Sequence, residues 1–121
     1  MYANVPSMLW LRLIAALSHL WPSFHEGVAT RFAAHGDAGN PDPNAACLHR
    51  SLDDQLDAIV AHRTLPCKAD VLICLPRTGR CTRARVGDRG PRRAMVDLAP
   101  LVAKRLQHNG KEPAILLAWD R

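Results

Sequence analysis

The sequence predicts a mainly β protein with one or two short helices, folded as one domain or at most two. Three observations predict this class. The chain has 121 residues, of which 48% are hydrophobic, so it can bury a core of its own. Residues 68–88 contain two segments of strand-like composition on either side of a turn. Apolar residues at helical spacing are confined to two short segments, 51–62 and 97–110.

The N-terminal segment is strongly apolar. "MLWLRLIAALSHLW" is interrupted only by Arg12, Ser18 and His19. It is too short and too interrupted to span a membrane comfortably. Two interpretations of residues 1–24 stay open: the hydrophobic region of a signal peptide, or an amphipathic N-terminal helix packed on the domain. The domain itself is expected over residues 27–121.

The first half of that domain is expected to contain a strand, a loop and a helix. "GVATRFAA" (27–34) has the β-branched residues of a strand. Residues 35–47 are rich in Gly, Asn, Asp and Pro, which predicts a polar loop. The segment 51–62 begins with Ser51 as a possible N-cap and has acidic residues in its first turn. Its apolar residues recur at helical spacing, which predicts a short helix.

The second half is expected to contain a hairpin, a helix and a last strand. Residues 68–76 and 80–88 predict two strands joined by a turn, because polar and apolar residues alternate in the second of them. The segment 97–110 predicts a helix with Asp97 as its N-cap and Asn109-Gly110 at its C-cap. The apolar "EPAILLAWDR" closes the chain as a strand.

The cysteine spacing favours two disulfides. The four cysteines, at 47, 67, 74 and 81, include no C-x-x-C pair, so a zinc ribbon or a thioredoxin-type motif is not supported. A hairpin centred between residues 77 and 78 places Cys74 directly opposite Cys81, within reach of a disulfide. Cys47 would then pair with Cys67. Disulfides indicate an oxidising compartment, and reduced core cysteines are the alternative.

The charge pattern leaves two interpretations open. The formal net charge is +5, and seven arginines cluster between residues 77 and 93. They form either a surface that faces a polyanion or ordinary solvated faces of strands and loops. No aromatic residue interleaves them, so a base-stacking platform is not expected. The histidines at 19, 25, 35, 49 and 108 show no metal-ligand spacing and are interpreted as surface residues; neither a metal nor a cofactor is expected.

Three motifs in order carry a resemblance to a known family. "VAHRTLPCKADVLICLPRTGRCTRARVGDRGP" followed by "MVDLAPLVAKRL" resembles the RlpA-like (rare lipoprotein A) family over roughly residues 27–118. The resemblance implies a six-stranded double-psi β-barrel with a groove for a long polysaccharide. The family includes lytic transglycosylases that cleave peptidoglycan, and the same barrel occurs in plant expansins, which loosen cell walls without evident hydrolysis.

The resemblance also implies a set of site residues. Asp88, Asp97 and His62 match the family's motif positions and are the catalytic candidates, since glycan cleavage needs an acid to protonate the leaving oxygen. The expected substrate contacts are Arg63, Arg85, Arg89 and Asp54. Each catalytic candidate has a structural alternative: Asp97 as a helix N-cap, Asp88 as a brace for its turn or a partner of Arg89, and His62 at the end of the short helix.

Departures from the family pattern keep two functions open. Ser51 stands where catalytic members have a Glu, and Arg31-Phe32 replaces an aromatic pair. One interpretation is a lytic transglycosylase that cleaves peptidoglycan. The other is a non-catalytic, expansin-like module that grips acidic wall polymers through Arg85, Arg89 and Arg92. A nucleic-acid binder ranks below both, because no such motif is present.

The expected setting follows from the family and the disulfides. We expect an exported protein, periplasmic or extracellular, that acts as a monomer and touches the membrane only through its N-terminal leader.

Overall fold

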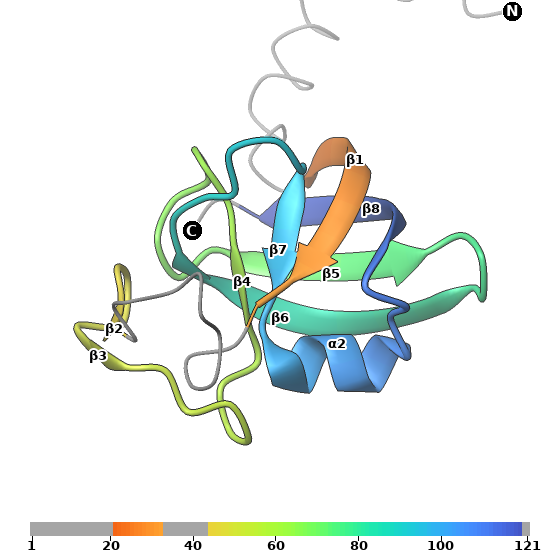
Figure 1. Cartoon of the computed structure of the whole chain (residues 1–121). Coiled ribbons are helices and arrows are strands. Elements are labelled where there is room, and N and C mark those ends of the chain that lie inside the picture. Colours follow the sequence, from red (N-terminus) through yellow and green to blue (C-terminus); the bar gives the residue numbers. More distant parts are fainter. Residues whose placement is uncertain (1–20, 33–43, 120–121) are drawn as a thin grey trace, which may run out of the picture.

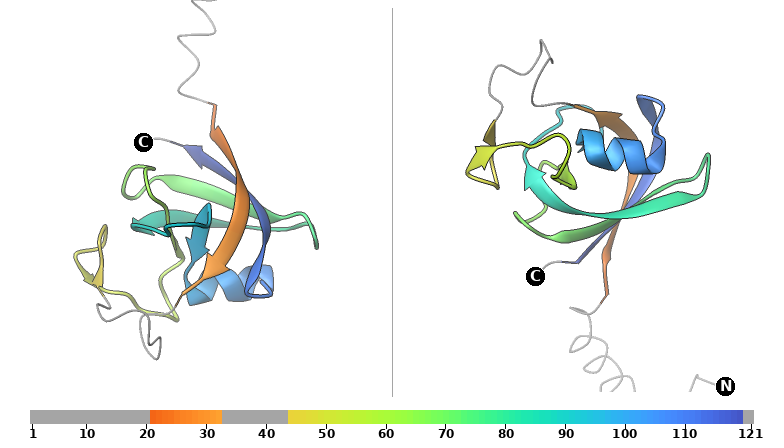
Figure 2. Two further views of the ribbon diagram at one scale, coloured as in Figure 1. Left: turned by 45° about the horizontal axis from the view of Figure 1, so that its top comes forward. Right: turned by 90° about the horizontal axis from the view of Figure 1, so that it is seen from below.

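Six strands close into a barrel in which the neighbours around the circle are β1, β7, β4, β6, β5 and β8 (Figure 1). The computed structural model describes residues 21–32 and 44–119. The barrel strands are β1 (Ser23–Arg31), β4 (Ile59–Ala61), β5 (Asp70–Leu75), β6 (Arg80–Asp88), β7 (Val96–Leu98) and β8 (Lys111–Trp119). A small hairpin of β2 (Asn44–Ala45) and β3 (Arg50–Ser51) projects from the side of the barrel (Figure 2), and α2 (Pro100–Leu106) is the single helix among the described residues.

The strand order contains an internal two-fold relation. Two neighbouring pairs, β1–β7 and β4–β6, are parallel, and all other pairs are antiparallel. If β1 is exchanged with β6, β4 with β7 and β5 with β8, each parallel pair maps onto a parallel pair and each antiparallel pair onto an antiparallel pair. Two interlocked crossovers related in this way make the six-stranded double-psi barrel that the family resemblance implied.

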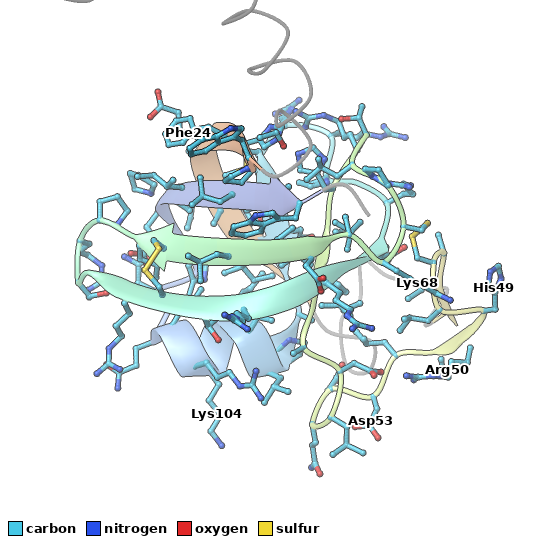
Figure 3. The ribbon with its side chains drawn as sticks, turned by 180° about the vertical axis from the view of Figure 1, so that it is seen from behind. Phe24, His49, Arg50, Asp53, Lys68 and Lys104 are labelled. Atoms are coloured by element: carbon cyan, nitrogen blue, oxygen red, sulfur yellow. A yellow bond between two sulfur atoms is a disulfide. The ribbon has the colours of Figure 1, made fainter. Side chains whose placement is uncertain are left out.

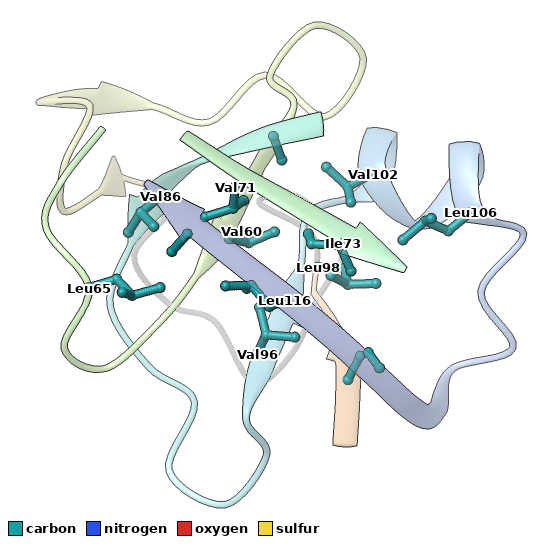
Figure 4. Packing of buried hydrophobic residues seen from close by; sticks show 14 of the residues in the cluster. Val60, Leu65, Val71, Ile73, Val86, Val96, Leu98, Val102, Leu106 and Leu116 are labelled. Carbon is teal, nitrogen blue, oxygen red and sulfur yellow. The ribbon is translucent and has the colours of Figure 1, made fainter. Parts of the chain in front are cut away.

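Strict alternation along the longer strands fills the barrel. In β5, Val71, Ile73 and Leu75 are buried while the residues between them are partly exposed. In β8, Leu116 is buried between two buried alanines in the same way. Successive side chains of a strand point to opposite faces, so these residues meet inside the barrel (Figure 4). Helix α2 adds Val102 and Leu106 to this core at one end of the barrel.

Two glycines leave room for the side chains of neighbouring segments. A Cβ added at Gly87, in β6, would lie 2.6–2.7 Å from side-chain atoms of Ile59 in β4. In β1, a Cβ added at Gly27 would lie 2.6 Å from the Cβ of Met95. Side chains at either glycine would therefore force β4 away from β6, or the segment before β7 away from β1. Gly87 also lies at the register shift between β4 and β6.

Both expected disulfides are confirmed. Cys74 and Cys81 stand directly opposite each other in the β5–β6 hairpin, with Cα atoms 4.1 Å apart. Cys47 is bonded to Cys67, with Cα atoms 5.3 Å apart. The second bridge fastens the β2–β3 hairpin to the loop that precedes β5.

The helix predicted over residues 51–62 is wrong. β3 ends at Ser51, a turn follows, and Ile59 begins β4. The acidic residues stabilise the turn instead of a helix: Asp53 Oδ1 accepts the backbone N–H groups of Gln55 and Leu56, and Asp57 Oδ2 accepts that of Asp53. The β-branched residues at 59 and 60 are drawn into the barrel, so long-range pairing overrides local helical spacing.

The helix predicted over residues 97–110 is confirmed only in its centre. Its N-cap is Ala99, and Pro100 occupies the first helical position, where its missing N–H costs no hydrogen bond. Ala99 precedes proline and is held extended, so the helix begins only after it. Asp97 therefore lies in β7 and is not the N-cap. The helix ends at Gln107, whose φ of 51° gives the left-handed cap predicted for Asn109-Gly110.

Two further expectations are corrected at the ends of these elements. The strand expected from residue 27 begins at Ser23 and ends at Arg31. His108 was expected at the surface but is buried, with its Nε2 2.9 Å from the carbonyl oxygen of Ala29 and its Nδ1 accepting the N–H of Gly110. The imidazole thereby ties the end of α2 to β1. Nearby, the buried carboxylate of Glu112 accepts two bonds from Arg77, and these hydrogen bonds lower the pKa of Glu112.

Part of the N-terminal expectation lies outside the described residues. Residues 1–20 and most of the polar loop 35–47 fall there, so the choice between signal peptide and packed helix stays a prediction. Within the part of the chain that the structure describes, no helix has the length and apolar character needed to cross a bilayer.

The close approach at Gly87 can be tested by one methyl group. We expect Gly87→Ala to lower the free energy of unfolding by about 1–3 kcal/mol, because the added Cβ overlaps Ile59. Adding Ile59→Ala should not restore stability, since the Cβ of Ile59 itself lies 2.7 Å from the new methyl. Urea unfolding followed by circular dichroism measures both variants. Wild-type stability in Gly87→Ala would contradict the packing described.

Candidate functional site

Strand β4 brings two of the predicted catalytic residues into one row. Ala61 pairs with Asp88 on one side and with Asp97 on the other, and Asp97 pairs in turn with Thr30 of β1. Val96 and Leu98 are fully buried in the core, so Asp97 between them faces outward. Two interstrand spacings separate the backbones of Asp88 and Asp97, which is about 10 Å.

Both carboxylates are used in hydrogen bonds that hold the structure. Asp88 Oδ1 accepts the N–H of Arg89 at 2.8 Å and that of Ala46 at 3.0 Å. The first bond braces its own turn, as the structural alternative predicted, and the second fastens the β2–β3 hairpin to the barrel. Asp97 Oδ1 accepts the hydroxyl of Thr30 at 2.8 Å and links β7 to β1.

His62 is a buried, neutral imidazole at the end of β4. Its side chain is 6% exposed, and its Nδ1 accepts the N–H groups of Thr64 and Leu65 at 3.2 and 3.1 Å. A nitrogen that accepts two backbone donors holds no proton, so the ring hydrogen is on Nε2. Burial lowers the pKa of His62, and the nearby His25, Arg63 and Arg89 lower it further. The expected place at a helix end is wrong, because no helix forms there.

His25 is a neighbour that sequence reasoning missed. Its ring lies edge-on to that of His62 with the centroids 5.4 Å apart, and its Nε2 is 2.9 Å from the hydroxyl of Ser23. Gly27 and Ala29 follow His25 at intervals of two, so the alternation of β1 directs His25 toward the barrel interior. In the sequence, the histidines were considered only for the spacing of metal ligands, and that spacing could not reveal the contact between His25 and His62.

Two of the predicted substrate-binding arginines hold loops in place. Arg89 donates to the carbonyls of His62 and Leu65, and its Nη2 lies 3.3 Å from the sulfur of Cys67. Arg63 donates to the carbonyls of Pro91 and Ala94 at 2.8 and 2.7 Å. Together they fasten the loops that follow β4 and β6 to each other. Arg92 is exposed.

A basic groove lies elsewhere, against β6 and the turn that follows β3. Its volume is about 500 Å³, and a second hollow of about 340 Å³ shares Asp70, Arg83 and Ala84 with it. We call the two together the β6 groove. Figure 3 looks onto the sheet that carries it, with Lys68 just before the start of β5 and Arg50 on the projecting hairpin. The charged residues that line the larger hollow are Arg50, Lys68, Arg83, Arg85, Asp57 and Asp70.

The β6 groove carries an excess of positive charge. Arg50 makes a bidentate pair with Asp57 at 2.7 and 2.8 Å, which lowers the pKa of that carboxyl, and Arg85 pairs with Asp70 at 3.3 Å. Among the residues that the structure describes, Lys68 and Arg83 have no acidic partner. Four cations against two carboxylates leave a formal charge of +2 in this hollow.

The sequence located this groove only in part. Arg85 was predicted as a substrate contact, and the alternation of residues 80–88 already placed Arg83 on the same face. Arg50 and Lys68 were missed because they come from β3 and from the loop before β5, which are distant in sequence. The disulfide Cys47–Cys67 and backbone hydrogen bonds to β6 bring these segments together. Asp54 lines a separate hollow formed by β3 and the turn that follows it, together with Arg50, Asp53 and Gln55 among others.

The described residues offer no preformed metal centre. Within residues 21–32 and 44–119, no group of three or more His, Cys, Asp or Glu side chains lies close enough to hold an ion.

Comparisons with known proteins support the fold. Neither a protein-family model nor a curated protein sequence matches the chain. Among solved structures, the chain is similar to Streptomyces papain inhibitor, with a TM-score of 0.59 and 19% identity over 79% of this chain and 94% of the other. It is also similar to cerato-platanin 3 from M. perniciosa, with a TM-score of 0.49 and 10% identity over 78% and 93% of the two chains. At such identity, the likeness to the papain inhibitor shows a common fold and nothing further, so membership of the RlpA-like family stays a prediction.

The buried state of His62 predicts a loss of stability in mild acid. The folded protein holds the ring neutral, so the unfolded chain takes up the proton first as the pH falls below about 6.5. The free energy of unfolding should therefore decrease between pH 7 and pH 5. His62→Asn keeps an acceptor near the position of Nδ1 but does not titrate, so its stability should fall less over this range. Urea unfolding at each pH measures both proteins; identical pH dependence would contradict a depressed His62 pKa.

Proposed function

We propose that the protein binds an acidic polysaccharide of the cell wall without cleaving it. The observation that carries this proposal is the β6 groove, whose larger hollow has an excess of two positive charges. Peptidoglycan is the polymer that the family resemblance suggests, and its peptide stems carry free carboxylates. Arginine forks suit such groups, since they can donate two parallel hydrogen bonds to one carboxylate.

The predicted catalytic residues favour a binding module over an enzyme. Asp88 accepts two backbone N–H groups, Asp97 accepts a hydroxyl, and His62 uses its Nδ1 for the loop that follows it. A general acid must instead be free to give a proton to the leaving oxygen. In these bonds Oδ1 of each aspartate is an acceptor that holds the fold together, which gives both residues a structural role without catalysis.

A lytic transglycosylase is the second candidate, because Asp88 and Asp97 do stand in one outward row beside Ala61. Incubation with purified peptidoglycan sacculi separates the two functions. The binding proposal expects co-sedimentation and no anhydro-muropeptides. Release of these products by the wild type but not by Asp88→Asn would overturn it; this substitution keeps a carbonyl oxygen that can accept the bonds of Arg89 and Ala46. Inhibition of papain without binding to sacculi would point instead to the activity named for the Streptomyces neighbour.

We also infer export to the periplasm or the outside of the cell. Two disulfides in a chain of 121 residues, with every cysteine of the sequence bonded, are typical of proteins that fold in an oxidising compartment.

The charge of the β6 groove should determine binding to sacculi. We expect the double variant Arg83→Gln/Arg85→Gln to bind about tenfold more weakly at low salt, equivalent to about 1.4 kcal/mol, because two cations are lost from one hollow. Lys104→Gln/Arg105→Gln, which removes two exposed cations of α2, is the matched control and should bind like the wild type. Co-sedimentation at increasing protein concentration gives the affinities. Equal weakening by the α2 variant would mean that net charge alone is responsible.

The two disulfides should differ in their effect on binding. Replacing Cys47 and Cys67 by alanine should cost about 3 kcal/mol of stability and detach the wall that carries Arg50, so binding falls. Replacing Cys74 and Cys81 should cost about 2.5 kcal/mol and leave binding unchanged, since that bridge lies in a hairpin away from the larger hollow. Both are measured at a temperature where thermal unfolding shows the variants folded. Equal binding by the two variants would argue against the hairpin as part of the site.

A further inference from the structure

One wall of the smaller hollow is an aromatic ring. Trp119 at the end of β8 pairs with Asp70 of β5, and in the next row of outward residues Leu72 of β5 pairs with Arg83 of β6. Side chains in these rows point to the same face of the sheet. The indole of Trp119, the side chain of Leu72 and the guanidinium of Arg83 consequently border one space of about 340 Å³.

These groups match the parts of an acidic sugar. A pyranose ring has a C–H face that packs on a flat aromatic surface, and tryptophan offers such a surface with little conformational freedom to lose. Arg83 can pair with a carboxylate on the same sugar. Asp70 can accept hydrogen bonds from sugar hydroxyls, and its charge is balanced by Arg85 at 3.3 Å. The volume falls in the range of small-molecule sites.

We propose that this hollow is a subsite for one hexose unit that carries a carboxylate, with its ring on Trp119 and its carboxylate on Arg83. The inference rests on the proposed function and names the chemical class of the ligand at one end of the β6 groove. Because the two hollows share Asp70 and Arg83, the next units of the same polymer would run toward Lys68 and Arg50. In this proposal, Trp119 supplies a sugar-stacking ring in place of the one that is lost where Arg31-Phe32 replaces the family's aromatic pair.

The test uses two soluble probes and isothermal titration calorimetry. Tetragalacturonate consists of carboxylated hexoses, whereas poly-γ-glutamate carries carboxylates without sugar rings. We expect the wild type to bind both. Trp119→Leu should weaken binding of tetragalacturonate at least tenfold and leave poly-γ-glutamate within twofold, whereas Arg83→Gln should weaken both.

Phe24→Leu is the matched control. Phe24 is 60% exposed and lies on β1, one strand beyond β8, but does not line the hollow, so this variant should bind tetragalacturonate as the wild type does. Unchanged binding by Trp119→Leu, equal weakening by both aromatic variants, or a wild type that binds only poly-γ-glutamate would each overturn the subsite and leave the proposed function standing. A wild type that binds neither the sacculi nor poly-γ-glutamate would overturn the proposed function itself.

Discussion

The structure depends on the parallel pairing of β4 with β6 at Gly87. The Ile59 side chain of β4 occupies the space where a Cβ on Gly87 would lie, and β4 pairs with β6 on one side and with β7 on the other. The six strands close into a barrel, so none of them has an open edge. The pairing of β4 with β6 and β7 also places Ala61 between Asp88 and Asp97, and it leaves His62 at the end of β4.

The residues of the motif "GDRGP" have structural roles around the β4–β6 pairing that do not depend on catalysis. Gly87 leaves room for Ile59, Asp88 holds the projecting hairpin, Arg89 holds the loop after β4, and Gly90 adopts a φ of 104° that favours glycine. Each of these residues thus has a structural role in this barrel. The fold accounts for the motif, and the function proposed above resides on another face of the sheet.

Locally encoded features were predictable from the residues themselves. Among the features assembled from distant segments, the barrel was expected through the family resemblance and the Cys47–Cys67 bridge by elimination, whereas the β6 groove was not expected. The β5–β6 hairpin and its Cys74–Cys81 bridge follow from alternation and from the turn between them, both within twenty residues. The segment 51–62 was wrongly predicted as a helix. Its acidic residues stabilise a turn, and its β-branched end pairs with β6, which is distant in the sequence. The β6 groove draws on the hairpin, the loop before β5, β6 and the end of β8, and no spacing in the sequence connects these four.

Two arginines of the β6 groove are already paired with carboxylates of the protein itself, so an anionic ligand must compete with these internal partners. Asp57 is tethered beside Arg50 and Asp70 beside Arg85, so each of these arginines meets a carboxylate at a high effective concentration before any ligand arrives. A single free anion competes poorly against such a tethered partner. A polymer that engages Lys68 and Arg83 first presents its next carboxylates at a similar local concentration and can exchange with the internal ones. Under the function proposed above, this arrangement would favour long polyanions over small anions.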